Sequence, residues 1–238
     1  MNELQKKYER EILEIVDACR RCSELEYVTS SGGNLSVRAQ EGVILITPTK
    51  TPKRKMQFED ICIIDEDGNE IFFPEGKKPT GETPFHIRIM KNRPDIKAIV
   101  HAHPPIITGF AIARSQELSK AILPEPVIEV GPMLNVKYAA PLSEELSREF
   151  DEVIHKSNGF VMENHGALVC SGNSITEAVD HLEMYEAMAK SIVVSKVLGN
   201  TAVLNAEDVE QLQNVADIRS LSRPGGDNLK SLVEIYNL

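Results

Sequence analysis

Apolar residues recur every three or four positions along several stretches of this chain, which is the spacing of one face of an α-helix. Thr83 followed by Pro84 is typical of a helix N-cap and a first helical position. Ser174 and Glu177 have the spacing of a capping box, which predicts the start of a long helix. The predicted helices cover residues 3–25, 83–91, 105–114, 143–157 and 174–198, with a last one from about residue 205.

Other apolar stretches are short and are bounded by turn residues, as β-strands are. Residues 33–49 contain two such runs around a Glu-Gly turn, and residues 61–73 alternate as a hairpin around Asp67-Gly68. Residues 159–170 are predicted to be two strands that turn at Asn164-His165-Gly166. Strands joined by hairpins and interleaved with helices predict an α/β fold with a mixed, largely antiparallel sheet between helical layers. Further strands are predicted at 96–103, 126–131 and 135–141.

No Gly/Ser-rich or Pro-rich linker interrupts the sequence, so residues 1–238 are expected to form a single domain. The C-terminal tail, from about residue 220, contains Pro224-Gly225-Gly226, a turn that would permit a hinge. Two interpretations of the tail stay open, namely that it closes over a neighbour's site or that it is simply mobile.

Composition narrows the classes of function. The formal net charge of −10 argues against general nucleic-acid binding, which depends on a basic surface. The N-terminus is charged in every turn and no apolar run approaches the roughly 20 residues of a membrane span, so we expect a cytoplasmic protein without a membrane partner. "CRRC" has the spacing of a zinc or redox pair but lies on a predicted helix without a second pair, which favours buried thiols. The four cysteines, expected to be free in a reducing compartment, are Cys19, Cys22, Cys62 and Cys170.

The stretch "IKAIVHAHPP" places His101 and His103 at the end of an apolar strand. Because side chains alternate across a strand, both imidazoles point to the same side. Each buried ring needs a partner for its polar N–H, and a divalent metal about 2.0–2.1 Å from both rings would meet that need. The alternative is a pair of core histidines that hydrogen-bond elsewhere, and these two residues leave both interpretations open.

His165 interrupts the apolar run "MENHGALV" and is predicted to lie on a tight turn. Three neutral imidazoles would leave a zinc ion its full charge and an open position, as catalytic sites do. Glu82 precedes the predicted N-cap, where its default role is to partner the helix dipole. If Glu82 also faces the metal, it becomes a fourth ligand or a general base. The remaining histidines lie on predicted helices and are assigned no role: His86, His155 and His181.

Glycine, threonine and basic residues gather between residues 32 and 55 of this acidic chain. Gly32-Gly33-Asn34 is a turn of the kind that presents backbone N–H groups to an anion. Two hypotheses follow, a solvated basic loop or a phosphate pocket. The hydroxyl and basic side chains concerned are Thr47, Thr49, Lys50, Lys53, Arg54 and Lys55.

In their order and spacing, "GGNLSVR", "LITPT", "PTGETPFH", "IVHAHPP" and "ENHGAL" resemble the class II aldolase/epimerase family, typified by L-fuculose-1-phosphate aldolase, over roughly residues 5–200. The resemblance implies a three-layer α/β/α fold and a homotetramer with active sites between neighbouring subunits. It also implies a zinc-dependent lyase, with Mn²⁺ or Co²⁺ as other metals, that cleaves a ketose 1-phosphate such as L-fuculose 1-phosphate to dihydroxyacetone phosphate and an aldehyde.

By the same resemblance, His101, His103 and His165 are the zinc ligands. Glu82 ligates the metal when the site is empty and moves the proton during turnover. The residues that the resemblance implies would bind the substrate phosphate are Asn34, Thr49, Lys50, Thr80 and Gly81.

Three departures from the family pattern keep other activities open. Thr80-Gly81 stands where the aldolase has a serine pair, and Lys50 where glycine is usual. The aldolase has a tyrosine after the HxH helix that protonates the aldehyde oxygen, whereas this chain reads "KAILPEPVIEVGP" there. A sugar-phosphate dehydratase or a decarboxylase on the same metal site therefore remains an alternative. The 4-epimerase branch carries aspartate in place of Glu82, and a non-catalytic interaction module would lack the metal ligands, so both are less expected.

Overall fold

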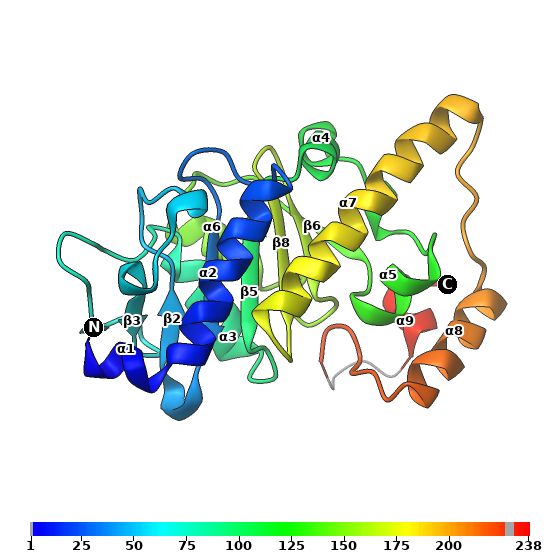
Figure 1. The fold of residues 1–238 in the computed structure, drawn as a ribbon. Coiled ribbons are helices and arrows are strands. Elements are labelled where there is room, and N and C mark those ends of the chain that lie inside the picture. The colour runs from blue at the N-terminus through cyan, green and yellow to red at the C-terminus, as the bar shows by residue number, and fades with distance from the viewer. Residues whose placement is uncertain (1, 227–230) are drawn as a thin grey trace.

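The computed structural model describes residues 2–226 and 231–238 and has a mixed eight-stranded sheet at its centre, in the order β4-β3-β2-β1-β5-β8-β7-β6 (Figure 1). Every neighbouring pair is antiparallel except β6 and β7, which are parallel. The predicted mixed, largely antiparallel sheet is thus confirmed. The strands are β1 Asn34–Arg38, β2 Ile44–Ile46, β3 Cys62–Ile64, β4 Glu70–Phe72, β5 Ala98–Ala102, β6 Met133–Val136, β7 Gly159–Met162 and β8 Gly166–Ser171.

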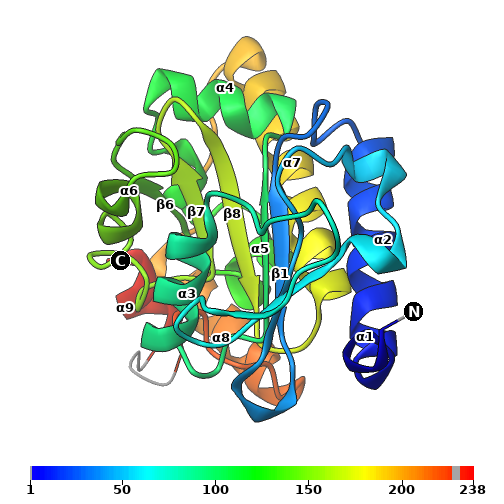
Figure 2. The ribbon, with the colours of Figure 1, turned by 90° about the vertical axis from the view of Figure 1, so that its left-hand side faces the viewer.

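Helices cover both faces of this sheet and give the expected three layers. The long helices α2 and α7 cross one face, and α3 and α6 lie against the other (Figures 1 and 2). The helices are α1 Glu3–Lys7, α2 Glu9–Glu24, α3 Thr83–Asn92, α4 Pro105–Ala113, α5 Pro124–Glu129, α6 Glu144–Arg148, α7 Ile175–Leu198, α8 Ala206–Ile218 and α9 Leu232–Tyr236.

The central strands are buried on both faces, so their apolar residues divide between two cores. All five residues of β5 are buried. Ala98 and Val100 belong to the core under α2 and α7, whereas Ile99 belongs to the core under α3 and α6. His101 alternates with these residues and therefore lies on the same side as Ile99, against Phe85 of α3, at 5.7 Å between ring centroids. The strand pattern that predicted this sheet also fixes the direction of the first histidine.

Capping residues account for most of the helix ends, and differences in capping account for the predictions that were wrong at these ends. Ser174 caps α7 by accepting from the Glu177 backbone N–H, but the Glu177 carboxylate bonds the Asn173 amide and the Ser171 hydroxyl, so only half of the predicted capping box forms. The N-cap of α3 is Glu82 rather than Thr83. A full reciprocal box does form at the start of α8, between Asn205 and Asp208.

Four predicted elements differ from the structure. The stretch 126–131 is not a strand but the end of α5, which Pro124 and Pro126 start, because proline in a first turn removes no helical hydrogen bond. The helix predicted over 3–25 is interrupted at Tyr8, whose φ of −113° and ψ of 30° are not helical. The helix predicted to reach residue 157 ends at Arg148 and continues as turns, and the strand predicted over 135–141 is β6, which starts earlier.

The C-terminal elements pack against α5 in a third, smaller core. Within the predicted tail, Pro224 lies against Gly131, and the Gly225 N–H donates to Asn158 Oδ1 at 3.2 Å. Mobility of the tail, like the single domain, stays a prediction. In the part of the chain that the structure describes, no helix has the length and apolar character needed to cross a membrane.

Candidate metal centre

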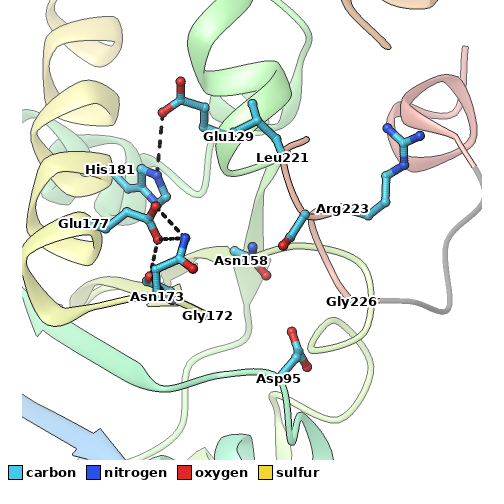
Figure 3. A pocket seen from close by; sticks show the side chains of 12 residues that line it. Asp95, Glu129, Asn158, Gly172, Asn173, Glu177, His181, Leu221, Arg223 and Gly226 are labelled. Atoms are coloured by element: carbon cyan, nitrogen blue, oxygen red, sulfur yellow. Dashed lines mark hydrogen bonds and ion pairs between the residues drawn. The ribbon is translucent and has the colours of Figure 1, made fainter. Parts of the chain in front are cut away.

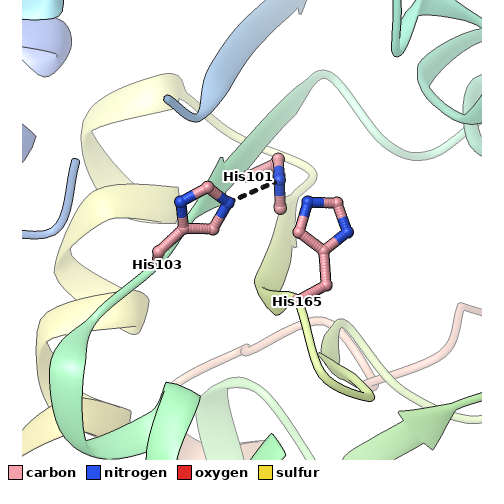
Figure 4. Close-up of side chains that lie close together, drawn as sticks. All are labelled: His101, His103 and His165. Atoms are coloured by element: carbon pink, nitrogen blue, oxygen red, sulfur yellow. Dashed lines mark hydrogen bonds between the residues drawn. The ribbon is translucent and has the colours of Figure 1, made fainter. Parts of the chain in front are cut away.

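Three histidines from separate segments meet at one end of β5 and β8. His101 lies in β5, His103 follows it, and His165 stands on the turn between β7 and β8. Because β8 pairs with β5 in a register that sets Leu168 opposite His101, this turn brings His165 beside the other two rings. One ligating nitrogen from each ring lies within 4.8 Å of the others (Figure 4). Among the residues that the structure describes, this is the one group of three or more such side chains placed to hold a metal ion.

The hydrogen bonds of His101 assign its tautomer. The ring is fully buried, and its Nδ1 lies 2.9 Å from the Ala167 carbonyl oxygen, which can only accept, so Nδ1 carries the proton. Nε2 therefore holds the lone pair, and it lies 3.2 Å from His103 Nε2. A backbone carbonyl that fixes the far nitrogen of a ligating imidazole is a common support in metal sites.

All three rings are held in the neutral form that metals bind. Burial, followed by the charge of the neighbouring histidines, keeps the pKa of His101 well below its usual range. Burial lowers the pKa of His103 to about 4 and also lowers the pKa of His165. The site therefore presents three unprotonated imidazoles at neutral pH, which is the donor set of a divalent-metal centre.

The Glu82 carboxylate faces this cluster and does not cap its own helix. As the N-cap residue of α3, Glu82 makes no side-chain hydrogen bond to the helix, so partnering the helix N–H groups is not its use here. Its Oε2 lies 3.4 Å from His101 Nε2, and its Oε1 lies 3.5 Å from His165 Nε2. The side chain is buried, so both contacts are shielded from water. The structure thus brings together the four residues predicted as ligands.

Sequence reasoning missed a buried histidine behind Glu82. Asn34 Nδ2 donates to Glu82 Oε2 at 2.7 Å, and Asn34 Oδ1 lies 2.5 Å from His86 Nε2. The other ring nitrogen of His86 lies 2.7 Å from Ser36 Oγ. The available signal was the spacing of four residues between Glu82 and His86, which places them on one helix face.

The residues predicted to hold a phosphate lie on two adjacent segments. A bridge between Pro48 and Pro79, with the Thr80 N–H donating to the Thr47 carbonyl, holds these segments side by side. Asn34 is directed at Glu82 and His86, as described above. The phosphate role of all five residues stays a prediction. Thr49 and Lys50 are exposed, whereas Thr80 is buried and Gly81 follows it.

Position 50 shows why glycine is common there in the family. Lys50 has a φ of 57°, in the left-handed region that glycine adopts without strain. A lysine in this conformation stores roughly 1 kcal/mol of strain while it projects a charge into solvent.

The basic segment contains one buried lysine. Arg54 and Lys55 are exposed, but Lys53 is only 1% exposed, and its ammonium donates to the Ser31 and Thr51 carbonyls at 3.3 and 3.4 Å. Burial lowers the pKa of Lys53, and its charge contributes to the low pKa of His103. The solvated-loop hypothesis therefore fits its exposed neighbours and not Lys53.

The four cysteines are free and buried, as predicted. Cys19 and Cys22 pack in the core under α2, and burial raises the pKa of both thiols. Such thiols do not ionise at neutral pH, which argues against a zinc or redox role for "CRRC".

A polar cavity of about 150 Å³, separate from the histidine cluster, lies near the C-terminal segment, beyond the far end of β8 (Figure 3). His181 there contacts Glu129 at 3.7 Å, while Glu177 is bonded to Asn173 and Ser171. The acidic groups of this cavity are thus already engaged by protein partners, and none of the predicted site residues lines it.

Comparison with known proteins agrees with this geometry. The profile of the family "Class II Aldolase and Adducin N-terminal domain" matches residues 13–193, and the chain belongs to this family. An L-fuculose phosphate aldolase of Methanococcus maripaludis is 37% identical over 180 residues, which are 76% of this chain and 94% of that protein. A 3-oxo-tetronate 4-phosphate decarboxylase of Haemophilus influenzae is 31% identical over 179 residues, 74% of this chain and 83% of that protein.

Solved structures show the same fold. YgbL of Escherichia coli, whose description leaves aldolase, epimerase and decarboxylase open, superposes with a TM-score of 0.78 at 26% identity, over 88% of this chain and 99% of that one. An L-fuculose 1-phosphate aldolase superposes with a TM-score of 0.76 at 24% identity, over 89% and 96% of the two chains. The relatives thus include both aldolases and decarboxylases that act on sugar phosphates.

Proposed function

We propose that this protein is a divalent-metal lyase, with zinc as the first metal and Mn²⁺ or Co²⁺ as others, that cleaves a ketose 1-phosphate such as L-fuculose 1-phosphate. The products are dihydroxyacetone phosphate and an aldehyde. The observation that carries the proposal is the Glu82 carboxylate, which leaves its helix end uncapped and faces His101 and His165 instead. Structural zinc sites are mostly built from cysteine thiolates, whereas three histidines with an open position are typical of catalytic sites, and a non-catalytic module needs neither the histidines nor the carboxylate.

The side chains fit a catalytic metal. Three neutral imidazoles, His101, His103 and His165, would hold the ion and leave coordination positions for substrate oxygens. The bound ion supplies Lewis-acid stabilisation of the negative charge that develops when a carbon–carbon bond breaks.

Glu82 moves the proton in this mechanism. When the bond between carbons 3 and 4 breaks, the electron pair stays on carbon 3 of the phosphate-bearing fragment. The hydroxyl on carbon 4 gives its proton to water, or to a base that a neighbouring subunit supplies, and becomes the aldehyde, while Glu82 takes up one proton from water in exchange. Glu82 then delivers a proton to carbon 3, a task that suits a buried carboxyl group within reach of the cluster. Asn34, Thr49, Lys50, Thr80 and Gly81 are proposed to hold the phosphate.

A decarboxylase acting on a 3-oxo sugar-acid phosphate is the second candidate, because of one sequence feature. No tyrosine occurs between residues 104 and 137, where the family aldolase has the one that exchanges a proton with the aldehyde oxygen. Carbon dioxide leaves without any such proton, so a decarboxylase does not need that residue. Both reactions require Glu82 to protonate the carbon that is left behind.

The test is a panel of ketose 1-phosphates and 3-oxo-acid phosphates incubated with the metal-loaded protein, with and without a chelator. Release of dihydroxyacetone phosphate identifies the aldolase, and release of carbon dioxide identifies the decarboxylase. Glu82→Gln is expected to lower kcat by about 10²–10⁴-fold, the usual contribution of a positioned acid or base. Glu210→Gln, an exposed carboxylate on α8, is the matched control. Full turnover by Glu82→Gln would sink the proton-transfer role.

We also propose that the protein is a homotetramer and works in the reducing cytoplasm, which suits its four free thiols. An apolar groove of about 580 Å³ between α4 and α7 supports the assembly, as does Val197, which is 83% exposed beside it. Because α4 begins two residues after His103, a subunit packed there would border the metal centre. Light scattering at several concentrations tests the assembly, and a monomer at every concentration would refute it.

A further inference from the structure

Four residues form a buried hydrogen-bonded group around Glu82. Strand β1 supplies two of them and the start of helix α3 supplies the other two. Asn34 and Ser36 lie two apart on β1, so their side chains share a face of the sheet. Glu82 and His86 lie one helical turn apart at the start of α3. Asn34 stands opposite His101 in the β1–β5 ladder, which places this group at the metal centre.

The hydrogen bonds of this group can run in one direction only while Glu82 is ionised. A carboxylate accepts, so the Asn34 atom at 2.7 Å from Glu82 Oε2 must be the donating Nδ2, and Oδ1 then faces His86. His86 must therefore carry its proton on Nε2, and its Nδ1 accepts from the Ser36 hydroxyl. The reverse direction would set Asn34 Oδ1 against the carboxylate oxygen, acceptor against acceptor, unless Glu82 were protonated.

We propose that His86, oriented by Ser36, is a positioning residue that fixes which end of the Asn34 amide faces Glu82 and thereby makes the two oxygens of Glu82 unequal. Oε2 is anchored by Asn34, and Oε1 remains directed at His165 as the oxygen that carries the proton. This inference rests on the proton-transfer role proposed for Glu82 and gives that role its geometry.

Burial supports the arrangement. His86 and Ser36 are fully buried, and Asn34 is 3% exposed, so no water competes for these bonds. Burial lowers the pKa of His86 to about 3, which keeps the ring singly protonated at any pH at which the protein works. The ring also stacks on Phe85, at 4.8 Å between centroids and an interplanar angle of 27°, so its orientation is held from the side.

The direct test is the tautomer of His86. Long-range ¹H–¹⁵N correlation spectra of the protein labelled at histidine nitrogens are expected to show a protonated Nε2 and an unprotonated Nδ1 for His86. The His86→Gln variant identifies the signal by its loss. The opposite tautomer, or a doubly protonated ring at neutral pH, would overturn the proposal. This measurement needs no substrate, so it stands whether or not the proposed reaction is found.

The kinetic test compares two replacements of similar size. Glutamine can place an N–H near the position of His86 Nε2 and is expected to keep kcat within about threefold. Leucine leaves Asn34 free to flip and is expected to lower kcat by roughly 10–100-fold with little change in KM, since displacement of a reacting group by about 1 Å has that effect. Ser36→Ala, which frees the tautomer, is expected to fall between them.

Wild-type kcat in a folded His86→Leu variant, or a His86→Gln variant no better than His86→Leu, would refute the positioning role. If His86→Leu does not fold, the tautomer spectrum and Ser36→Ala decide. Absence of turnover in the wild-type protein would instead refute the proposed function. The nitrogen spectrum of His86 would then remain as the test of the hydrogen bonds among Ser36, His86 and Asn34.

Discussion

Gly166, the first residue of β8, is the position where one added methyl group should most directly disturb the candidate metal centre. Its φ is not in the left-handed region, so alanine introduces no backbone strain there. A Cβ at this position would lie 2.5 Å from His103 Cδ2 and 2.6 Å from the Ala102 carbonyl oxygen. The effect of Gly166→Ala is therefore purely steric. The added methyl group would press against Ala102 and His103.

The size of the effect follows from these distances. Both contacts are roughly 1 Å shorter than a normal van der Waals separation. The Ala102 carbonyl belongs to the β5–β8 pair, in which Ala102 stands opposite Ala167, and cannot swing away alone. We expect the His103 ring to move by a large part of an ångström, with a loss of about 1–3 kcal/mol in stability from overpacking. Metal affinity should fall about 10–100-fold, as when the support of a ligand is removed.

The assay is a titration of metal-free protein with Co²⁺ or Zn²⁺ against a competing chelator, with the thermal midpoint measured alongside. Gly109→Ala is the matched control within one subunit, because Gly109 lies on α4, just after the histidines, and a Cβ there meets nothing within 4 Å; since Gly109 also lines the groove proposed for assembly, light scattering must show that the variant assembles as the wild type does. That variant should keep metal affinity and gain about 0.5–1 kcal/mol of helix stability. Wild-type metal affinity in Gly166→Ala would show that the ring is not held by this contact, and the reasoning would fail.

Three further predictions concern buried charged or titratable groups. Arg93 is 3% exposed and donates to the Ile154 and Ser157 carbonyls as well as to Asp95, so Arg93→Met should lower the free energy of unfolding in urea by about 3 kcal/mol. The pKa of His86 is about 3 in the fold, so the unfolded chain binds its proton first as pH falls from about 6.5, and stability drops through that window. Between pH 7.5 and 5, His86 is expected to contribute about 2 kcal/mol to the fall in the free energy of unfolding. Urea unfolding of the His86→Gln variant should show a fall that is smaller by this amount. An equal fall in both proteins would contradict the low pKa of His86. Lys53→Met should raise the free energy of unfolding by up to about 1 kcal/mol, because the variant no longer buries an ammonium group whose two hydrogen bonds are long. A lower free energy of unfolding in urea would show that these hydrogen bonds outweigh the cost of burying the charge.

Short-range rules were enough to predict the sheet and to place the histidines at strand ends, whereas the ligand set came from the resemblance to the family. Alternation along β5 sets the direction of His101, and an Asn-His-Gly turn places His165 at a strand end. Such rules depend only on neighbours in sequence, and the hairpin turns predicted which neighbouring strands pair. The interpretation failed where neighbours are ambiguous. The run at 126–131 suits a short strand or a short helix equally well, and the prolines ahead of it decide for α5.

The roles of His86 and Lys53 depended on contacts that no local pattern contains. His86 looked like a plain helical histidine, because its partners Asn34 and Ser36 are about 50 positions away in sequence. The sequence left Lys53 between a solvated basic loop and a phosphate pocket, because its burial depends on the way the segment packs against α2. A polar side chain in a fold is defined by what covers it, and that information resides in the tertiary structure.

The choice between the two candidate reactions reduces to one proton. The proposed metal ligands, the proposed phosphate pocket and Glu82 would serve both reactions equally, because each reaction leaves a negative charge on the carbon beside a polarised carbonyl. Only the aldolase must also take a proton from the hydroxyl of the leaving fragment. Tyr138, the first tyrosine after the HxH motif, is 55% exposed. An aldolase built on this chain needs a group that takes this proton, and a neighbouring subunit packed on α4 is an arrangement that could bring one to the site. If the protein proves to be a monomer that still releases carbon dioxide, the decarboxylase follows from the same geometry without any further residue.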